Sequence, residues 1–317
     1  MNRYDKYKES IQKFMASTTI NDLSDDSIKK LVSDYVTKDN KMIPTLLLTI
    51  LNSQNKKNNV SIQGYHLAMS IECLLLLTSL YNDKNSHLLS KILTIKNFTS
   101  TLLSNNLNDI KNSYTALKVN NVYVKSYDAF NNYVKQIDKL CDFKFDVIQI
   151  NIHQDVSKWY IRDDKSNNAV KLSQLNQIKK ESFEKYMESS IVIICEYAIV
   201  MGWLLGNGEA KLMPKLKQLS RYFAYIFKIS RDFANIENDI NNMNNDEKWS
   251  NNYVINYGLQ ESYNIFIKNK IKFTEESIAL DLLTPTIKEI LECATKNIDD
   301  IIDQTSPDIK SGFSKIF

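Results

Sequence analysis

Side chains that could bind a metal ion or attack a substrate are present but scattered along the chain. No pair of cysteines has CxxC spacing, no histidine stands at zinc-ligand spacing from a cysteine, and most of the cysteines have apolar neighbours. We therefore expect free thiols in a reducing compartment and core or surface roles for the histidines. These residues are Cys73, Cys141, Cys195 and Cys293, with His66, His87 and His153.

The charged side chains give one local signal. Lys228 and Asp232 stand four residues apart within an apolar segment, so both lie on one face of a helix and are expected to form an ion pair. Arg231 adds a second cation beside them. Elsewhere the balance is nearly even, with 40 basic and 37 acidic residues and a net charge of +3. This charge does not favour a nucleic-acid partner, and the Lys211–Lys217 run indicates a solvated helix face.

The elements that hold these residues are predicted to be helices. The chain has only 6 Gly and 4 Pro, too few for the many turns of an all-β protein or the glycine-rich loops of a dinucleotide-binding fold. Ser24 resembles a helix cap before Ile28, and Pro44 opens a second apolar helix. Long apolar helices are expected at Gly64–Tyr81, Glu181–Leu205 and Leu216–Ile240.

Two segments depart from this pattern. Phe143–Ile152 partly alternates apolar and polar residues, but it has no obvious partner strand, so we expect a helix or an extended loop, with a short hairpin as the alternative. The polar stretch 155–180 is predicted to be a surface insertion. No linker is evident, which predicts one domain over residues 1–317.

The sequence also bears on location. The charged N-terminus resembles no signal peptide. The apolar run Ile191–Leu205, which contains Glu196, is shorter than the roughly 20 residues of a membrane span. We therefore expect a cytoplasmic protein without a membrane span.

Three stretches occur in the order of known motifs between about residues 35 and 260. They are Ile71-Glu72 followed by Asn82-Asp83, then Met201–Gly208, then Phe227–Phe233 followed by Trp249, Asn252-Tyr253 and Gly258. This set resembles the trans-isoprenyl diphosphate synthase (polyprenyl synthetase) family, particularly divergent members from large DNA viruses. The resemblance implies an all-α, isoprenoid-synthase-type helical bundle.

The family joins an allylic diphosphate to isopentenyl diphosphate, and aspartates on two facing helices hold the Mg²⁺ that neutralises the leaving diphosphate. At the family's two aspartate motifs this chain retains only Asp83 and Asp232. Leu88 takes the place of a carboxylate in the first motif. Arg231 takes the place of one in the second, and its guanidinium cannot bind a metal ion. The remnant motif positions are Asn82, Asp83, Arg231, Asp232 and Asn235.

The family's diphosphate-binding cations are altered as well. Where the family has G-G-K-x-x-R-P, this chain keeps the final proline as Pro44 but has Asn40 and Ile43 in place of the lysine and the arginine. The family's Lys-Thr pair falls on Ser190 and Ile191. Three cations remain as a candidate metal-independent anion site: Lys41, Lys228 and Arg231.

We therefore predict a catalytically degenerate trans-prenyltransferase homologue that acts as a structural, scaffolding or regulatory subunit. The alternatives are an active prenyltransferase with a rebuilt metal site, and a metal-independent binder of an anionic or lipid-diphosphate ligand. A terpene-cyclase variant has little support, because Asn242 stands where the motif beginning at Asn238 needs Ser or Thr.

The same resemblance bears on cofactors, partners and location. No cofactor is expected, and Mg²⁺ only if the chain is active. The expected partners are a second copy or a related subunit, with an isoprenoid diphosphate as candidate ligand. If the chain is viral, the virion is an alternative location to the cytoplasm.

Overall fold

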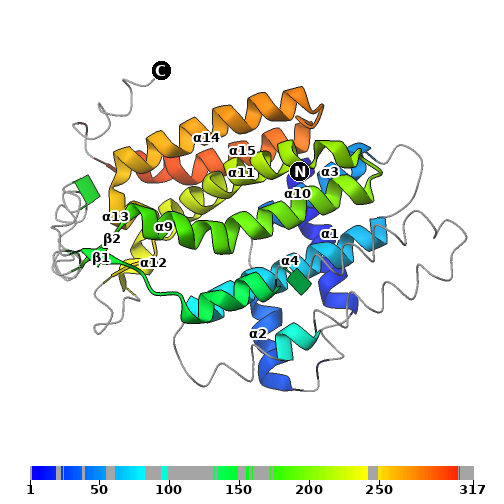
Figure 1. Ribbon diagram of the computed structural model, residues 1–317, viewed down its shortest axis with the longest axis horizontal. Helices are drawn as coiled ribbons and strands as arrows, with labels where there is room; N and C mark the ends of the chain where they lie inside the picture. The colour runs from blue at the N-terminus through cyan, green and yellow to red at the C-terminus, as the bar shows by residue number, and fades with distance from the viewer. Residues whose placement is uncertain are drawn as a thin grey trace, which may run out of the picture. The chain divides into compact units, whose positions relative to one another are not determined.

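The computed structural model is built almost wholly from helices (Figure 1). It describes residues 2–18, 23, 25–37, 40–54, 61–82, 94–98, 131–132, 134–148, 155–156, 159, 172, 175–241, 249–305 and 307. The longer helices are α1 (Arg3–Thr18), α2 (Asp26–Val36), α3 (Met42–Gln54), α4 (Ser61–Asn82), α9 (Lys180–Met187), α10 (Ile193–Leu205), α11 (Met213–Ala234), α14 (Leu259–Ala279) and α15 (Pro285–Ile302). The short elements are η3 (Lys139–Asp142), β1 (Val147–Ile148), β2 (Gln177–Ile178), η4 (Glu188–Val192), η5 (Ala210–Leu212), α12 (Ile236–Asn241) and α13 (Tyr253–Tyr257). The predicted all-α class is confirmed.

The chain divides into two compact units. The first contains Met1–Phe143, Glu188–Arg221 and Glu276–Ile290, and the second contains Lys144–Met187, Tyr222–Glu275 and Leu291–Phe317. Helices α11, α14 and α15 each contribute residues to both units. The prediction of one domain over residues 1–317 stays a prediction.

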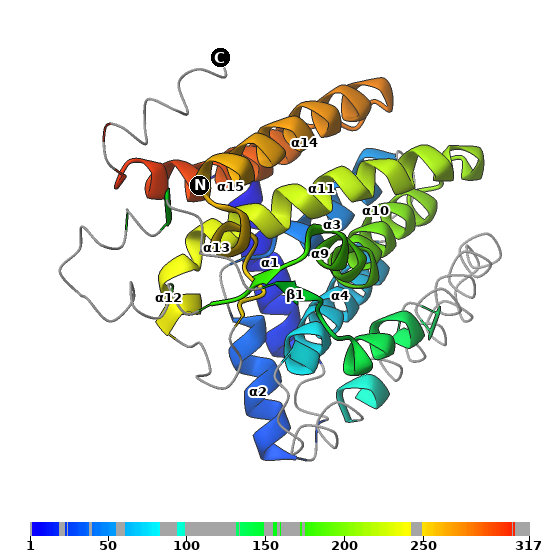
Figure 2. The same cartoon turned by 60° about the vertical axis from the view of Figure 1, so that its left-hand side comes forward.

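In the first unit, α3, α4 and α10 pack against one another and form the core (Figures 1 and 2). Every residue of α3 from Met42 to Leu51 is buried. Gly202 of α10 lies against the backbone of α3, where an added Cβ would stand 2.7 Å from the carbonyl oxygen of Leu47. The close approach of these two helices therefore requires glycine at position 202.

The predicted helix Glu181–Leu205 is confirmed as one helical run, in which α9 and α10 are joined by the π-helical segment η4. By length and hydropathy the run Lys180–Leu205 could cross a membrane, with a window of mean hydropathy 1.6. However, 78% of that window is buried inside the protein. This burial is the pattern of a core helix, as the sequence predicts.

Two predicted helix boundaries need correction. The cap of α2 is Asp25, whose Oδ1 accepts from the backbone N–H of Ser27 at 2.9 Å and of Ile28 at 3.2 Å, whereas Ser24 lies outside the described residues. The predicted helix Leu216–Ile240 divides at Asn235 into α11 and α12. The Asn235 amide donates to the carbonyl oxygen of Arg231 at 2.8 Å, and such local bonds compete with regular helix.

The expectation of helix or loop at Phe143–Ile152 was wrong for Val147 and Ile148. These two residues form β1, which pairs antiparallel with β2 in the register Val147–Ile178 and Ile148–Gln177. The partner strand was not obvious because it comes only after residues 149–176. It lies at the end of the predicted insertion 155–180, whose described apolar residues include Val156, Leu172, Leu175 and Ile178, all buried.

Candidate functional site

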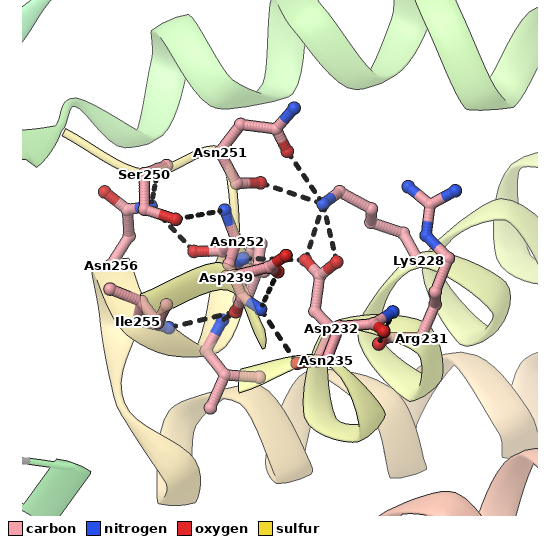
Figure 3. A network of polar contacts seen from close by, with 12 residues as sticks. Lys228, Arg231, Asp232, Asn235, Asp239, Ser250, Asn251, Asn252, Ile255 and Asn256 are labelled. Atoms are coloured by element: carbon pink, nitrogen blue, oxygen red, sulfur yellow. Dashed lines mark hydrogen bonds and ion pairs between the residues drawn. The ribbon is translucent and has the colours of Figure 1, made fainter. Parts of the chain in front are cut away.

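The last two turns of α11 place Lys228 and Asp232 in the interior of the second unit, each no more than 2% exposed. The predicted ion pair between them is present (Figure 3). The ammonium nitrogen of Lys228 lies 2.7 and 2.6 Å from the two carboxylate oxygens of Asp232. It also lies 2.8 Å from the backbone oxygen of Asn251 and 3.0 Å from that residue's Oδ1. One ammonium group thus contacts four oxygen atoms.

Asn252 links this ion pair to the helix that follows. Its amide nitrogen donates to the backbone oxygen of Asp232 at 2.8 Å and to Oδ2 of Asp239 at 2.7 Å. Its Oδ1 accepts from the backbone N–H of Val254 and Ile255 at 2.9 and 3.1 Å, which caps α13. The backbone N–H of Tyr253 donates to Oδ2 of Asp232 at 2.7 Å. The loop before α13 is therefore fixed to the Asp232 carboxylate.

Asn256 continues the network toward β2. Its amide nitrogen donates to the backbone oxygens of Ser250 and Asn252, at 2.6 and 2.7 Å, and its Oδ1 accepts from the N–H of Ile178 at 2.8 Å. Gly258 then ends α13 at φ 87°, a conformation that favours glycine. The motif that begins at Asn252 and ends at Gly258 thus has a structural explanation, namely a capped helix and a left-handed end.

The charges of this site are balanced. Lys228 and Arg231 provide two cations, and Asp232 and Asp239 provide two carboxylates. Burial lowers the pKa of Lys228, while Asp232 opposes that shift and Arg231 adds to it. Burial and the nearby Asp232 raise the pKa of Asp239, against its hydrogen bond from Asn252. A site that binds divalent cations needs an excess of negative charge, which these four groups do not provide.

Arg231 differs from its neighbours because, among the described residues, its guanidinium contacts an aromatic ring and no carboxylate. Its guanidinium is half-buried, lies 5.4 Å from the centre of the Phe227 ring, and in Figure 3 points away from the Asp232 carboxylate. Within the described part of the chain it makes no ion pair. The backbone oxygen of Arg231 accepts a hydrogen bond from the side-chain amide of Asn235, so the Asn235 side chain stabilises the end of α11.

The first unit contains a second buried lysine–carboxylate pair. The ammonium of Lys41 donates to Oε2 of Glu72 at 2.8 Å, and both residues are 1% exposed. The other carboxylate oxygen, Oε1, has no hydrogen-bond partner in the described structure. Burial raises the pKa of Glu72, and Lys41 opposes this shift. The backbone N–H of Lys41 donates to the Tyr4 hydroxyl at 3.3 Å.

The remaining predicted positions serve the fold where they are described. Asn40 accepts from the N–H of Met42 at 3.3 Å at the start of α3, and Ile43 is fully buried. Ser190 is buried in η4. Asn82 ends α4, while Asp83 and Leu88 lie outside the described residues, so the first aspartate motif cannot be placed.

The structure therefore brings together Lys228, Arg231, Asp232 and Asn235 in one unit, and Lys41 with Glu72 in the other. Sequence reasoning missed Asn251 and the contact of Asp239. Asp239 stands seven residues after Asp232, a spacing that returns to the same helix face and could have indicated it. Among the described residues, no three His, Cys, Asp or Glu side chains form a cluster that could hold a metal ion.

Comparison with known proteins identifies the architecture. No protein-family model matches the sequence, and no curated protein matches it. The fold is similar to a geranyltransferase from Helicobacter pylori, with a TM-score of 0.58 at 15% identity, covering 93% of this chain and 96% of that one.

Two further solved structures agree. An FPP/GFPP synthase from Zymomonas mobilis matches with a TM-score of 0.56 at 10% identity, over 92% of this chain and 96% of that one. The Helicobacter pylori geranyltransferase complexed with magnesium and isoprenyl diphosphate matches at 0.53 and 14% identity, over 94% and 96% of the two chains. The chain therefore has the helical fold of the isoprenyl diphosphate synthases.

Proposed function

We propose that this protein is a catalytically degenerate trans-prenyltransferase homologue that acts as a structural, scaffolding or regulatory subunit. The observation that carries this proposal is the position of Lys228, whose ammonium is bonded to both carboxylate oxygens of Asp232. Asp232 is the one carboxylate of the second aspartate motif that this sequence retains. Its oxygen atoms are already engaged by a cation that belongs to the chain.

Magnesium would have to displace that cation. Mg²⁺ requires near-octahedral oxygen ligands at about 2.0–2.1 Å and loses its water reluctantly. To reach Asp232 it would have to break the contacts of Lys228 and then lie beside an ammonium group and the Arg231 guanidinium. Two cations close together in a buried site repel strongly. The site is therefore better suited to holding the fold than to holding a metal ion.

The Lys41–Glu72 pair supports the same conclusion in the first unit. Lys41 was a candidate for binding a diphosphate, but its ammonium donates to Glu72 and is 1% exposed. Removing it from that carboxylate would leave a buried charge without a partner, which typically costs about 3–5 kcal/mol. This cost favours a structural role for Lys41.

The proposal is tested by an assay for prenyl transfer. Purified protein is incubated with Mg²⁺, isopentenyl diphosphate and allylic diphosphates of several lengths, and extended products are sought. We expect no extended product. The Arg231→Asp variant should also be inactive, because the other replaced positions still lack the family's charged groups. Losing each charge-stabilising group costs about 10²–10³ in rate. An active prenyltransferase in the same assay is the positive control. Turnover that Asp232→Asn abolishes would show instead a working enzyme with a rebuilt metal site.

A second candidate function rests on Arg231. A half-buried guanidinium that has no ion-pair partner among the described residues is suited to bind a diphosphate or another anion without a metal ion. Calorimetric titration with an isoprenoid diphosphate and with inorganic diphosphate, both in EDTA, tests this function. Binding that is lost in Arg231→Gln but kept in Arg221→Gln would establish it, because Arg221 already pairs with Glu188 at 2.7 Å.

A further inference from the structure

The ammonium of Lys228 is surrounded by oxygen atoms in the manner of a bound ion. Four oxygens lie 2.6–3.0 Å from its nitrogen, two from the Asp232 carboxylate and two from the backbone and side chain of Asn251. An ammonium group has only three N–H donors. The four oxygens therefore enclose the charge instead of each matching one N–H. Figure 3 shows them converging on the nitrogen from α11 and from the loop before α13, and we call them the oxygen cage.

Contacts other than those of Lys228 hold the cage oxygens in place. The backbone N–H of Tyr253 donates to Oδ2 of Asp232 at 2.7 Å. The side-chain nitrogen of Asn251 donates to the Tyr186 hydroxyl at 3.3 Å, and this bond directs Oδ1 of the same amide toward the ammonium. The cage is thus organised by the surrounding structure, and we expect it to persist when the lysine side chain is removed.

The charge of the cage favours a monovalent cation. It contains one carboxylate, that of Asp232, which a single positive charge balances. A divalent ion needs further negative charge, whereas the neighbouring Arg231 lowers the pKa of Lys228 and so opposes additional positive charge. The ring centre of Phe183 lies 5.6 Å from the ammonium and adds a cation–π contact.

The size of the cage points to a large monovalent ion. Its oxygens lie 2.6–3.0 Å from the centre, beyond the roughly 2.0–2.1 Å of Mg²⁺ and the roughly 2.3–2.6 Å of Ca²⁺. Potassium and ammonium ions have nearly equal radii, and both are larger than Na⁺. An ion that replaces the ammonium of Lys228 without moving the oxygens is therefore K⁺ or NH₄⁺.

We propose that the oxygen cage is a site for a monovalent cation of ammonium size, and that the chain fills this site with the ammonium of Lys228. When Lys228 is shortened to alanine, K⁺ or NH₄⁺ binds in its place and again joins Asp232 to Asn251. In the parent protein the tethered ammonium makes the loop before α13 independent of dissolved ions. The test measures stability and ion binding, so its outcome is separate from that of the prenyl-transfer assay.

Urea unfolding of full-length Lys228→Ala is measured while NaCl is exchanged stepwise for KCl at constant ionic strength. A ligand that binds only the folded state stabilises it in proportion to ligand concentration above Kd, so each tenfold rise in K⁺ should raise the ratio of folded to unfolded protein by up to about tenfold. NH₄Cl should act in the same way. So should n-propylammonium chloride, which supplies the atoms that the substitution removes. The parent protein should unfold at the same urea concentration in NaCl and KCl.

Two matched variants and one direct measurement complete the test. Lys228→Met fills the cage with an apolar side chain, and Lys228→Ala with Asp232→Asn removes the one negative charge, so neither should respond to K⁺. In crystals of Lys228→Ala grown with RbCl, anomalous scattering should place one Rb⁺ among the oxygens of Asp232 and Asn251.

Three results would overturn the proposal. Equal stability of Lys228→Ala in NaCl and KCl would show that the cage does not select an ion of this size. A variant that stays unfolded in every salt would show that K⁺ does not replace the ammonium. Stabilisation by MgCl₂ in place of KCl would show that the cage accepts a divalent ion.

Discussion

The two buried lysine–carboxylate pairs of this protein have similar exposure but very different surroundings. Lys41, the residue directly before α3, bonds to Glu72 of α4 through one hydrogen bond, and one oxygen of Glu72 has no partner in the described structure. Lys228 and Asp232 lie on a single helix, and they also hold the backbone at Asn251 and Tyr253. The first pair connects the start of α3 to α4, whereas the second fixes the loop before α13 and the first residue of that helix.

This difference determines what each pair contributes. Burying two charges costs desolvation energy that their attraction offsets only with good geometry and additional hydrogen bonds. Lys228 and Asp232 have those additional bonds, and Glu72 lacks them at Oε1. The second pair should therefore be harder to replace than the first.

The largest effect is expected from removing one member of the second pair. Asp232→Ala leaves the Lys228 ammonium buried without a carboxylate and the N–H of Tyr253 without an acceptor. We expect a loss of about 4 kcal/mol in the free energy of unfolding, measured by urea titration. Lys272→Ala, at an exposed pair, is the control and should change it by less than about 0.5 kcal/mol. A small effect of Asp232→Ala would show that the network is not needed for the fold.

Replacing each pair as a whole tests the comparison directly. Lys41→Met with Glu72→Leu should leave the free energy of unfolding within about 1 kcal/mol of the parent, because replacing a buried ion pair by apolar residues of similar size is often neutral. Lys228→Met with Asp232→Leu should cost about 3 kcal/mol, since the backbone groups of Asn251 and Tyr253 lose their partners. The comparison fails if the two double variants are equally stable.

The pH dependence of stability should reveal the less well satisfied carboxylate. The pKa of Glu72 is raised in the folded state above its ordinary value of 4.5, so the folded protein binds this proton more tightly than the unfolded chain. Its contribution is complete below pH 4.5 and is lost as pH rises through the raised pKa, by at most about 1.4 kcal/mol per pH unit.

Urea unfolding of the parent and of Glu72→Gln, measured from pH 4 upward, checks this. The parent should lose stability relative to the variant as pH rises. Asp239, whose pKa is also raised, titrates in both proteins and cancels from the difference. Parallel curves would mean that Glu72 does not titrate differently in the two states.

A further single substitution tests the end of α13. Gly258→Ala places a side chain at φ 87°, which should cost about 1–2 kcal/mol in the free energy of unfolding. Gly64→Ala in α4 provides a contrast, since its φ is ordinary and an added Cβ would meet only leucine side chains, 2.8 Å from Leu48 and 3.0 Å from Leu51. Equal effects at both sites would argue against backbone strain at Gly258.

The elements could be predicted where their signal is local. The scarcity of glycine and proline and the apolar periodicity predicted the helices, because a helix satisfies its backbone bonds within itself. The strand pair was missed because it depends on a partner distant in sequence, and the break at Asn235 depends on one side-chain bond to Arg231. The first aspartate motif lies outside the described residues, so the sequence prediction for Asp83 stands as a prediction.

The sequence by itself determined the helical fold class and the contact between Lys228 and Asp232, since four residues always bring two side chains to one face of a helix. Only the tertiary structure decided that this pair is buried, that Asn251 and Asn252 complete it, and that Lys41 meets Glu72. Those partners stand 20 to 31 residues away in the chain. Over such separations, packing and the need to satisfy buried polar groups select the contact, and no periodicity in the sequence records that choice.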